Sequence, residues 1–227
     1  MNNTRRSFIR VAGAGGALCA TGATTALSAP NNDSGLLDLF AKRQSVRLYK
    51  SDPVPEEHLR MILDAARRPP TSGNQQPWKF LVVRNKATIE RLRTRCLQLY
   101  EANWPKDLSP ADRATRKENA SKHLAGYFSA PVFIVVLTDS QSMYPTYNHH
   151  DGPLAAGYLC LAARALGYGT VYVTDAIPEQ ATREVLAIPE RYERVCITPL
   201  GLPDGWPEPM PKRKLEVSVV FESFGKE

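Results

Sequence analysis

The 227-residue sequence predicts an α+β fold, and three observations support this prediction. Segments with helical periodicity and segments with strand character follow one another without the regular βαβ repetition of a parallel sheet. Residues 131–138 and 195–200 are continuous apolar runs, as is typical of strands buried on both faces. Residues 31–227 contain no internal repeat and no linker, so we expect one domain in which helices pack against a central sheet.

The first half of this domain is predicted to mix short helices with loops and strands. A helix that begins near Asp52 has an early proline and acidic residues in its first turn, and Pro69 and Pro70 end it. Residues 103–119 are charged and poor in apolar side chains, so we expect a mobile, partly helical excursion there. The expected order is helix 36–43, extended segment 46–49, helix 52–67, polar loop 71–77, strand 78–83, helix 88–102, excursion 103–119 and strand 131–138.

The second half is predicted to surround a central helix. Residues 154–166 are apolar nearly all round, which indicates a buried helix, and Gly167 supplies its C-terminal stop. Residues 202–214 are rich in proline and predict a surface loop. The expected order is polar loop 139–150, helix 154–166, strand 170–173, helix 179–186, strand 195–200, loop 202–214 and a final strand 215–221.

The net charge of +6 gives no case for nucleic-acid binding. Residues 1–29 contain three arginines and no acidic residue, so the rest of the chain carries only +3. Such a domain can still hold a local basic pocket for a phosphate. The cysteines form no CxxC pair and no Cys/His cluster, which disfavours a zinc site, and Cys160 and Cys196 lie in apolar runs that indicate buried thiols.

Residues 1–29 resemble a twin-arginine (Tat) signal peptide. Arg5 and Arg6 are followed by Phe8 and then by a weakly apolar stretch rich in Gly and Ala, which is too short to predict a membrane-spanning helix. The resemblance implies export of the folded protein to the periplasm by the Tat machinery, with residues 30–227 as the mature domain. A basic tail on a cytoplasmic protein is the alternative.

Three polar and cationic segments carry the chemistry of a candidate site. The first places two arginines around a serine, a set that can hold a phosphate dianion through charge-assisted hydrogen bonds. The second packs hydroxyl and amide groups into a loop where they can meet the edge of a heterocycle, and the third is a run of cations. Taken alone, each segment more often has an ordinary structural role. The first would be a solvated basic helix end, the second a loop between a helix and a strand, and the third a charged surface segment. The segments contain Arg43, Gln44, Ser45 and Arg47; Pro70, Thr71, Ser72 and Asn74; and Lys212, Arg213 and Lys214.

In this order and spacing, the three segments resemble those of the FMN-dependent nitroreductase family. The resemblance runs from about residue 36 to residue 220, and residues 154–169 and 188–203 also resemble later landmarks of that family. It implies a nitroreductase-like fold, with a central mixed, mainly antiparallel sheet flanked by helices. It also implies an intertwined homodimer with two flavin sites at the interface.

The resemblance implies a role for each segment around FMN. Arg47 would lie near the pyrimidine edge of the flavin, where a cation stabilises the reduced, anionic ring and raises its potential. The phosphate and ribityl end would be held by Arg43, Gln44 and Ser45, and Lys212, Arg213 and Lys214 would complete the phosphate site. The backbone of Tyr172, Thr174 and Asp175 would contact the flavin ring, and one N–H of this loop would point toward N5. The flavin bound mainly by the other subunit would be contacted by Pro70, Thr71, Ser72 and Asn74.

Two departures from the family concern the ring and the substrate. Many members have Glu-Gly where this chain has Thr174-Asp175, and a residue other than glycine can change the local turn. The candidate lid segments, residues 100–122 and 139–150, match no family lid, so the substrate is left open.

The implied activity is a ping-pong transfer of hydride or electrons through flavin N5. A donor, for which NAD(P)H is a candidate, would reduce the flavin, and a small acceptor such as a nitroaromatic or quinone would reoxidise it. The flavin carries the chemistry, so we expect no catalytic side chain and no metal. NAD(P)H is not expected outside the cytoplasmic membrane, so export would require another donor.

Three alternatives remain open from the sequence. One is another activity on the same fold, such as a flavin-dependent dehydrogenase, a dehalogenase or a flavin-destroying enzyme. Another is a non-catalytic flavin-binding protein that relays electrons. The third is an exported binding protein without a cofactor, which would be colourless when purified.

Overall fold

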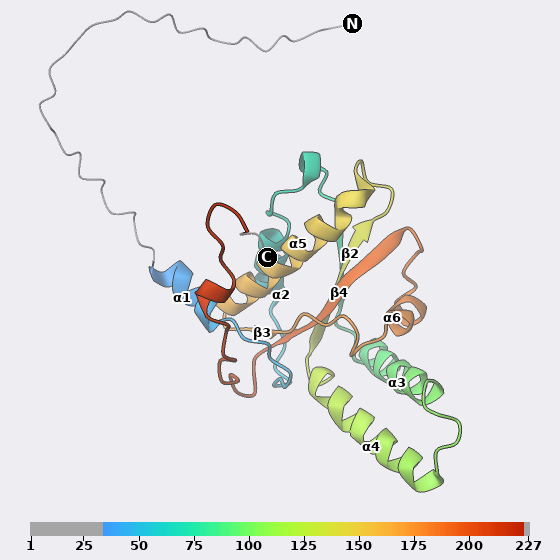
Figure 1. The fold of residues 1–227 in the computed structure, drawn as a ribbon. Helices are drawn as coiled ribbons and strands as arrows, with labels where there is room; N and C mark the ends of the chain where they lie inside the picture. The colour runs from blue at the N-terminus through green and yellow to red at the C-terminus, as the bar shows by residue number, and fades with distance from the viewer. Residues whose placement is uncertain (1–33, 225–227) are drawn as a thin grey trace, which may run out of the picture. The chain divides into compact units, whose positions relative to one another are not determined.

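A computed structural model describes residues 34–224, and the predicted signal peptide at residues 1–29 lies outside the described residues. Most predicted elements are confirmed, and none of the described helices is long and apolar enough to cross a membrane. The main elements, in the order shown in Figure 1, are α1 (Ser34–Lys42), α2 (Glu56–Ala66), β1 (Trp78–Val83), α3 (Lys86–Ala102), α4 (Pro110–Tyr127), β2 (Val132–Asp139), α5 (Asn148–Ala165), β3 (Gly169–Thr170), α6 (Glu179–Leu186) and β4 (Tyr192–Gly201).

The strands form one four-stranded antiparallel sheet in the order β1-β2-β4-β3. The predicted α+β class is confirmed, with a mainly antiparallel sheet flanked by helices. The one parallel pairing among the described residues is an isolated bridge between Ser45 and Thr170. β2 is central and almost fully buried, as its continuous apolar sequence predicts.

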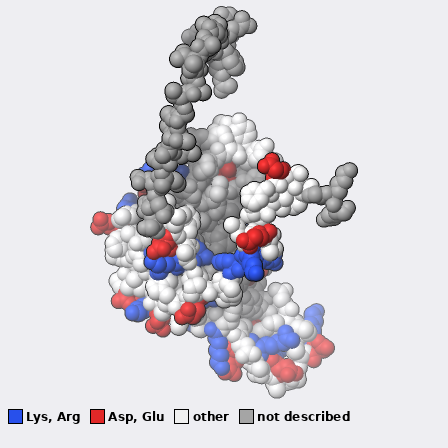
Figure 2. Space-filling model, turned by 60° about the vertical axis from the view of Figure 1, so that its left-hand side comes forward, with Lys and Arg blue, Asp and Glu red and all other residues white. Residues whose placement is uncertain are grey.

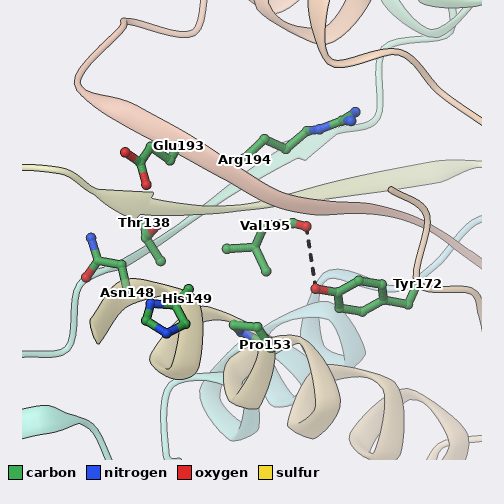
Figure 3. Close-up of a pocket in the computed structure, with 8 residues that line it drawn as sticks. All are labelled: Thr138, Asn148, His149, Pro153, Tyr172, Glu193, Arg194 and Val195. Carbon is green, nitrogen blue, oxygen red and sulfur yellow. Dashed lines mark hydrogen bonds between the residues drawn. The ribbon is translucent and has the colours of Figure 1, made fainter. Parts of the chain in front are cut away.

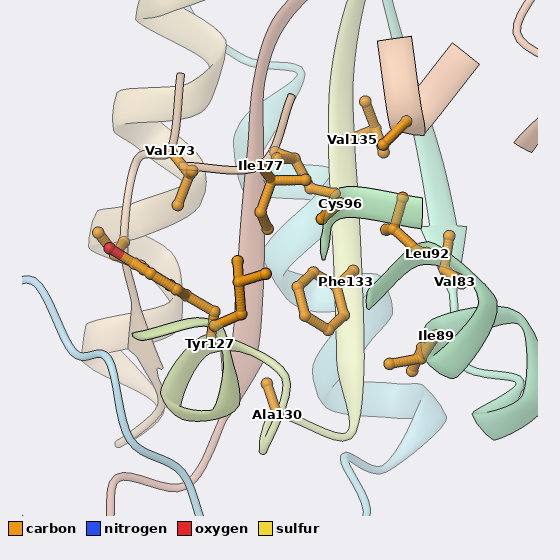
Figure 4. Packing of buried hydrophobic residues seen from close by; sticks show 14 of the residues in the cluster. Val83, Ile89, Leu92, Cys96, Tyr127, Ala130, Phe133, Val135, Val173 and Ile177 are labelled. Carbon is orange, nitrogen blue, oxygen red and sulfur yellow. The ribbon is translucent and has the colours of Figure 1, made fainter. Parts of the chain in front are cut away.

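Side chains of β2 alternate between two apolar cores, one on each face of the sheet. Phe133 and Val135 point into a core made with α3, α4 and α6, whose packing is shown in Figure 4. Ile134 and Val136 point into a second core made with α2 and α5. Cys96, Cys160 and Cys196 are buried free thiols within these cores, which agrees with the prediction for the last two.

The excursion predicted at residues 103–119 is partly helical, as expected, but its helix extends well beyond the predicted segment. The segment leads into α4, a regular helix of 18 residues. Ser109 caps this helix by accepting a hydrogen bond from the N–H of Asp112 at 3.1 Å, and Pro110 occupies its first turn. Only a narrow stripe is apolar, with Leu124 and Tyr127 buried, so composition alone did not reveal the full length of the helix.

Other boundaries also differ from the prediction. α5 begins at Asn148, inside the predicted polar loop, and contains Pro153 in its second turn, where the missing N–H leaves the carbonyl of His149 without its helical partner. The predicted strand 170–173 is shorter, because only Gly169–Thr170 forms β3 and Val173 makes an isolated bridge to Ile197. The predicted final strand 215–221 is absent from the described chain, which has a short 3-10 helix at Leu215–Val217 with exposed side chains instead.

Candidate functional site

The first predicted segment, residues 43–47, is bound to β3, which follows α5. The N–H of Val46 donates to the carbonyl of Thr170 at 3.0 Å, and Ser45 forms a parallel bridge with the same residue. Burial raises the pKa of the Cys160 thiol, while a hydrogen bond with Thr170 and the charge of Arg43 oppose that shift. The charge of Arg43 therefore acts on Cys160 of α5.

The chain just beyond this segment pairs with the start of the C-terminal loop. The N–H of Lys50 donates to the carbonyl of Leu202 at 2.9 Å, and the N–H of Asp204 donates to that of Leu48 at 3.1 Å. The loop that carries the predicted cations thus starts beside the first segment. Further along it the side chains of Lys212, Arg213 and Lys214 are exposed.

The predicted phosphate-binding cations form no ion pairs within residues 34–224, a state that they share with other cations such as Lys50 and Lys79. Elsewhere in residues 34–224, Lys and Arg side chains form many ion pairs, including Lys42 with Asp38 at 2.7 Å, one residue before Arg43. Figure 2 shows Lys and Arg side chains across the middle of the face that carries α1. None of those ion pairs includes the following cations: Arg43, Arg47, Lys212, Arg213 and Lys214.

The predicted ring-facing residues follow β3 directly. Tyr172 donates a hydrogen bond from its hydroxyl to the carbonyl of Val195 at 3.5 Å, and burial raises the pKa of this hydroxyl to about 12. The side chains of Thr174 and Asp175 are exposed. Because Thr170 binds Val46 and Tyr172 lies two residues further on, the structure brings the first segment and the ring-facing segment together.

A pocket of about 240 Å³ opens between the first turns of α5 and strand β4 (Figure 3). Tyr172 is the one predicted site residue in its lining, and its ring faces α5 together with Val195. The Arg194 side chain extends to the other side of β4. The lining residues are Thr138, Asn148, His149, Pro153, Tyr172, Glu193, Arg194 and Val195.

The second predicted segment forms a tight turn at the opposite end of α5. Thr71 and Asn74 close the turn, with the N–H of Asn74 donating to the carbonyl of Thr71 at 3.0 Å. Gly73 adopts φ 59°, and a Cβ there would lie 2.4 Å from the ring of Tyr144, so only glycine fits under that ring. Pro70 is exposed and Ser72 is half-buried.

A buried carboxylate, missed by the sequence analysis, holds this turn. Asp151, only 2% exposed, accepts hydrogen bonds from the N–H of Ser72 at 3.2 Å and from the Gln75 amide at 2.7 Å. The other end of the Gln75 amide accepts a bond from the N–H of Tyr144 at 2.7 Å. An acidic residue in the first turn of a helix is favourable for the dipole, which was the available signal, but the distant partner was not visible in the sequence.

The turn at residues 71–75 and the segment at 43–47 are bound near opposite ends of α5. Asp151, which binds the turn, is in the first turn of the helix, whereas Thr170, which binds the segment, follows the last residue of the helix, Ala165. The structure of one chain therefore does not bring Pro70, Thr71, Ser72 and Asn74 to the cations of the first segment.

The histidines show no catalytic or metal-binding arrangement. His58 shares a hydrogen bond with the Tyr168 hydroxyl at 2.8 Å, which gives it a structural partner. His149 and His150 are exposed, with ring centroids 3.8 Å apart. Within residues 34–224 no three His, Cys, Asp or Glu side chains lie close enough together to hold a metal ion.

Comparison with known proteins places this architecture in a family. The sequence matches the nitroreductase family over residues 40–202. It is 31% identical to an NADH dehydrogenase of Thermus thermophilus over 73% of this chain and 86% of that protein. It is 30% identical to an iodotyrosine deiodinase of Thermotoga neapolitana over 83% of this chain and 98% of that protein.

Solved structures agree with the sequence comparison. A crystal structure of iodotyrosine deiodinase bound to FMN and 3-iodo-L-tyrosine superposes with a TM-score of 0.67 and 27% identity. The superposition covers 83% of this chain and all of that chain. Because the family match spans most of the sequence and the fold agrees with it, this protein belongs to the nitroreductase family.

Proposed function

We propose that this protein is an FMN-dependent oxidoreductase that passes electrons from a reduced donor to a small organic acceptor. The observation that carries the proposal is the backbone pairing of the 43–47 segment with Thr170, which places Arg43 and Arg47 next to the ring-facing segment. Unpaired Arg and Lys side chains around backbone N–H groups suit a phosphate dianion, and the neighbouring ring-facing segment suits a flavin. When bound, FMN would supply the two-electron chemistry.

The residues of this chain would bind and orient the cofactor. Arg43, Gln44 and Ser45 would donate to the phosphate and ribityl groups, and Arg47 would place its charge near the pyrimidine edge of the ring. The loop cations would add to the phosphate site. These are Lys212, Arg213 and Lys214.

The proposal includes a homodimer with the site at the subunit interface. Its support is that Ser72 binds Asp151 in the first turn of α5, whereas the 43–47 segment pairs with Thr170, beyond the other end of that helix. The turn would then contact the flavin that the other subunit binds. For protein in the cytoplasm NAD(P)H is the proposed donor, because one relative is named an NADH dehydrogenase. Exported protein would need another donor.

The acceptor has two candidate classes. A nitroaromatic or quinone fits the family, whereas a halogenated aromatic is favoured by the similarity to iodotyrosine deiodinases. Reoxidation of the reduced protein by a nitroaromatic, a quinone and an iodophenol would separate these classes. A protein that is reduced but reoxidised by none of these would instead fit an electron relay.

Replacing Arg43 with alanine is expected to weaken FMN binding about 10-fold to 100-fold, because a charged hydrogen bond contributes about 1.5–3 kcal/mol. Arg47→Ala is expected to retain FMN and to lower the flavin potential. Fluorescence titration and redox titration measure the two effects. Lys42→Ala is the matched control, since the neighbouring cation is already paired with Asp38.

Each outcome has a separate meaning. Unchanged FMN affinity in Arg43→Ala would reject the phosphate role of that residue. An unshifted potential in Arg47→Ala would mean that this side chain only packs. Wild-type protein that stays colourless after FMN is supplied and the excess removed would overturn the proposed function.

Export is a further part of the proposal and rests on the paired arginines of the leader. Changing both Arg5 and Arg6 to lysine is expected to retain the protein in the cytoplasm, because the Tat pathway depends on the pair. Cell fractionation measures the distribution, with Arg10→Lys as the control. An unchanged distribution would argue for the cytoplasmic alternative, in which NAD(P)H is available.

A further inference from the structure

A bulge in β4 sends Arg194 to an unexpected face of the sheet. The pairing of β2 with β4 shifts between Val136 and Leu137, which pair with Cys196 and Arg194 respectively. Val195 is the extra residue, and both Val195 and Cys196 pack on the α5 side. The shift therefore turns Arg194 toward the opposite side, where α3 lies, in accord with its direction in Figure 3.

On that side the arginine meets the segment that follows Val173. One guanidinium nitrogen of Arg194 donates to the carbonyl of Thr174, and another donates to the carbonyl of Ile177 at 2.7 Å. The hydroxyl of Tyr100, from α3, donates to the carbonyl of Ala176 at 2.6 Å. Three carbonyls of one short segment are thus bound by two side chains from distant parts of the chain.

The same segment is fixed at both ends by the apolar core. Val173 exchanges backbone hydrogen bonds with Ile197 at 3.0 and 3.1 Å. The Ile177 side chain is fully buried in the cluster that contains Cys96 and Phe133 (Figure 4). Between these anchors the segment has no regular secondary structure, so the bonds from Arg194 and Tyr100 determine the orientation of its peptide groups.

The direction of the carbonyls fixes the direction of the amides. In a trans peptide the C=O and the following N–H point in opposite directions, and the described chain has no cis peptide. Because the Thr174 carbonyl points to Arg194, the N–H of Asp175 points away from it. Within residues 34–224 this N–H donates to no other residue, although it follows closely on Tyr172 at the candidate flavin site.

We propose that Arg194 and Tyr100 are positioning residues, which orient the 174–177 segment so that the N–H of Asp175 faces the bound flavin. This inference rests on the proposed function. Many family members have Glu-Gly at this position, and this chain does not. Here the side chains of Arg194 and Tyr100 would fix the direction of the Asp175 N–H instead.

An arginine suits this task better than a lysine. Its planar fork can donate to two carbonyls at fixed angles, whereas an ammonium group is a single point donor. Burial lowers the pKa of Arg194, and none of the ion pairs in the described residues includes it. The desolvated charge is therefore directed at backbone carbonyls, where charge-assisted bonds are strong.

Hydrogen exchange of the segment tests the proposal on the FMN-loaded, full-length protein. In wild type, FMN is expected to slow exchange in peptides that contain residues 174–177, because the Asp175 amide gains an acceptor. In Arg194→Met this protection is expected to be lost, and the FMN dissociation constant to rise about threefold to tenfold. Arg194→Lys is expected to restore part of both effects.

Two further variants separate the positioning role from a general loss of stability. Tyr100→Phe removes one hydroxyl and keeps the ring, so it is expected to fold and to lose part of the protection. Arg84→Met is the matched control, because Arg84 also donates to a backbone carbonyl, that of Val54 at 3.3 Å, far from this segment along the chain. It is expected to leave the FMN-dependent protection unchanged.

The outcomes separate this inference from the proposed function. If wild type binds FMN and protects the segment, but Arg194→Met and Tyr100→Phe do so equally, the positioning role is overturned and flavin binding stands. If wild type binds no FMN, both are overturned together. If Arg84→Met loses the protection as fully as Arg194→Met, the effect reflects general stability and the positioning role is overturned.

Discussion

Asp151→Ala is expected to lower the free energy of unfolding by about 2–5 kcal/mol, because it leaves two donors without their acceptor. The N–H of Ser72 and the amide of Gln75 both donate to this buried carboxylate. The affinity for FMN is expected to fall as well, since the 70–74 turn loses its attachment to α5. Chemical denaturation and FMN titration measure the two effects.

Asp151→Asn distinguishes the charge from the shape of this side chain. The asparagine keeps an acceptor for Ser72 but directs an amide NH₂ at the NH₂ of Gln75. Gln75 cannot simply rotate, because its carbonyl oxygen accepts the Tyr144 N–H at 2.7 Å. We therefore expect an intermediate loss of stability.

An exposed acid provides the control for this series. Asp64 pairs with Arg67 and Arg68 on the surface of α2, and such pairs contribute about 0–1 kcal/mol. Asp64→Ala is expected to change stability by no more than that. If Asp151→Ala costs as little as the surface control, the buried network does not hold the turn.

The elements that sequence predicted well are those whose signals are local. The apolar run of β2 and the alternation of β1 depend on burial of the strand itself. α4 was predicted only in part because its apolar stripe is narrow, although Ser109, Pro110 and Asp112 form a recognisable helix start. The segment 215–221 alternates like a strand, but a strand forms only where an edge supplies hydrogen-bond partners, and the sequence does not say whether one is available.

The candidate site was also predictable only in its local features. The cations and polar turns were visible as segments, but their neighbours were not. Thr170, Asp151 and Arg194 are single residues without a motif, and each acts on a segment far away in the sequence. Their partners depend on helix packing and on a bulge in β4, which no local pattern encodes.

Gly169→Ala is expected to destabilise the fold by about 3 kcal/mol, because it overfills a rigid contact between β3 and the 43–47 segment. A Cβ at Gly169 would lie 2.7 Å from the Cβ of Val46, which cannot be moved by rotating the side chain. Val46 is 1% exposed, and its N–H donates to the Thr170 carbonyl, so the backbone has to shift. Gly205→Ala, with open space around the added atom, is the control.

The same substitution tests whether the 43–47 segment forms the phosphate site. A shift of Val46 moves Ser45 and Arg47 with it, so FMN affinity measured on the folded fraction is expected to fall together with stability. Adding Val46→Ala removes the two γ-carbons that a Gly169 Cβ would meet and is expected to recover part of both losses. If stability falls while FMN binds the folded variant as tightly as wild type, the segment is not where the phosphate binds, and the unpaired cations there need another explanation.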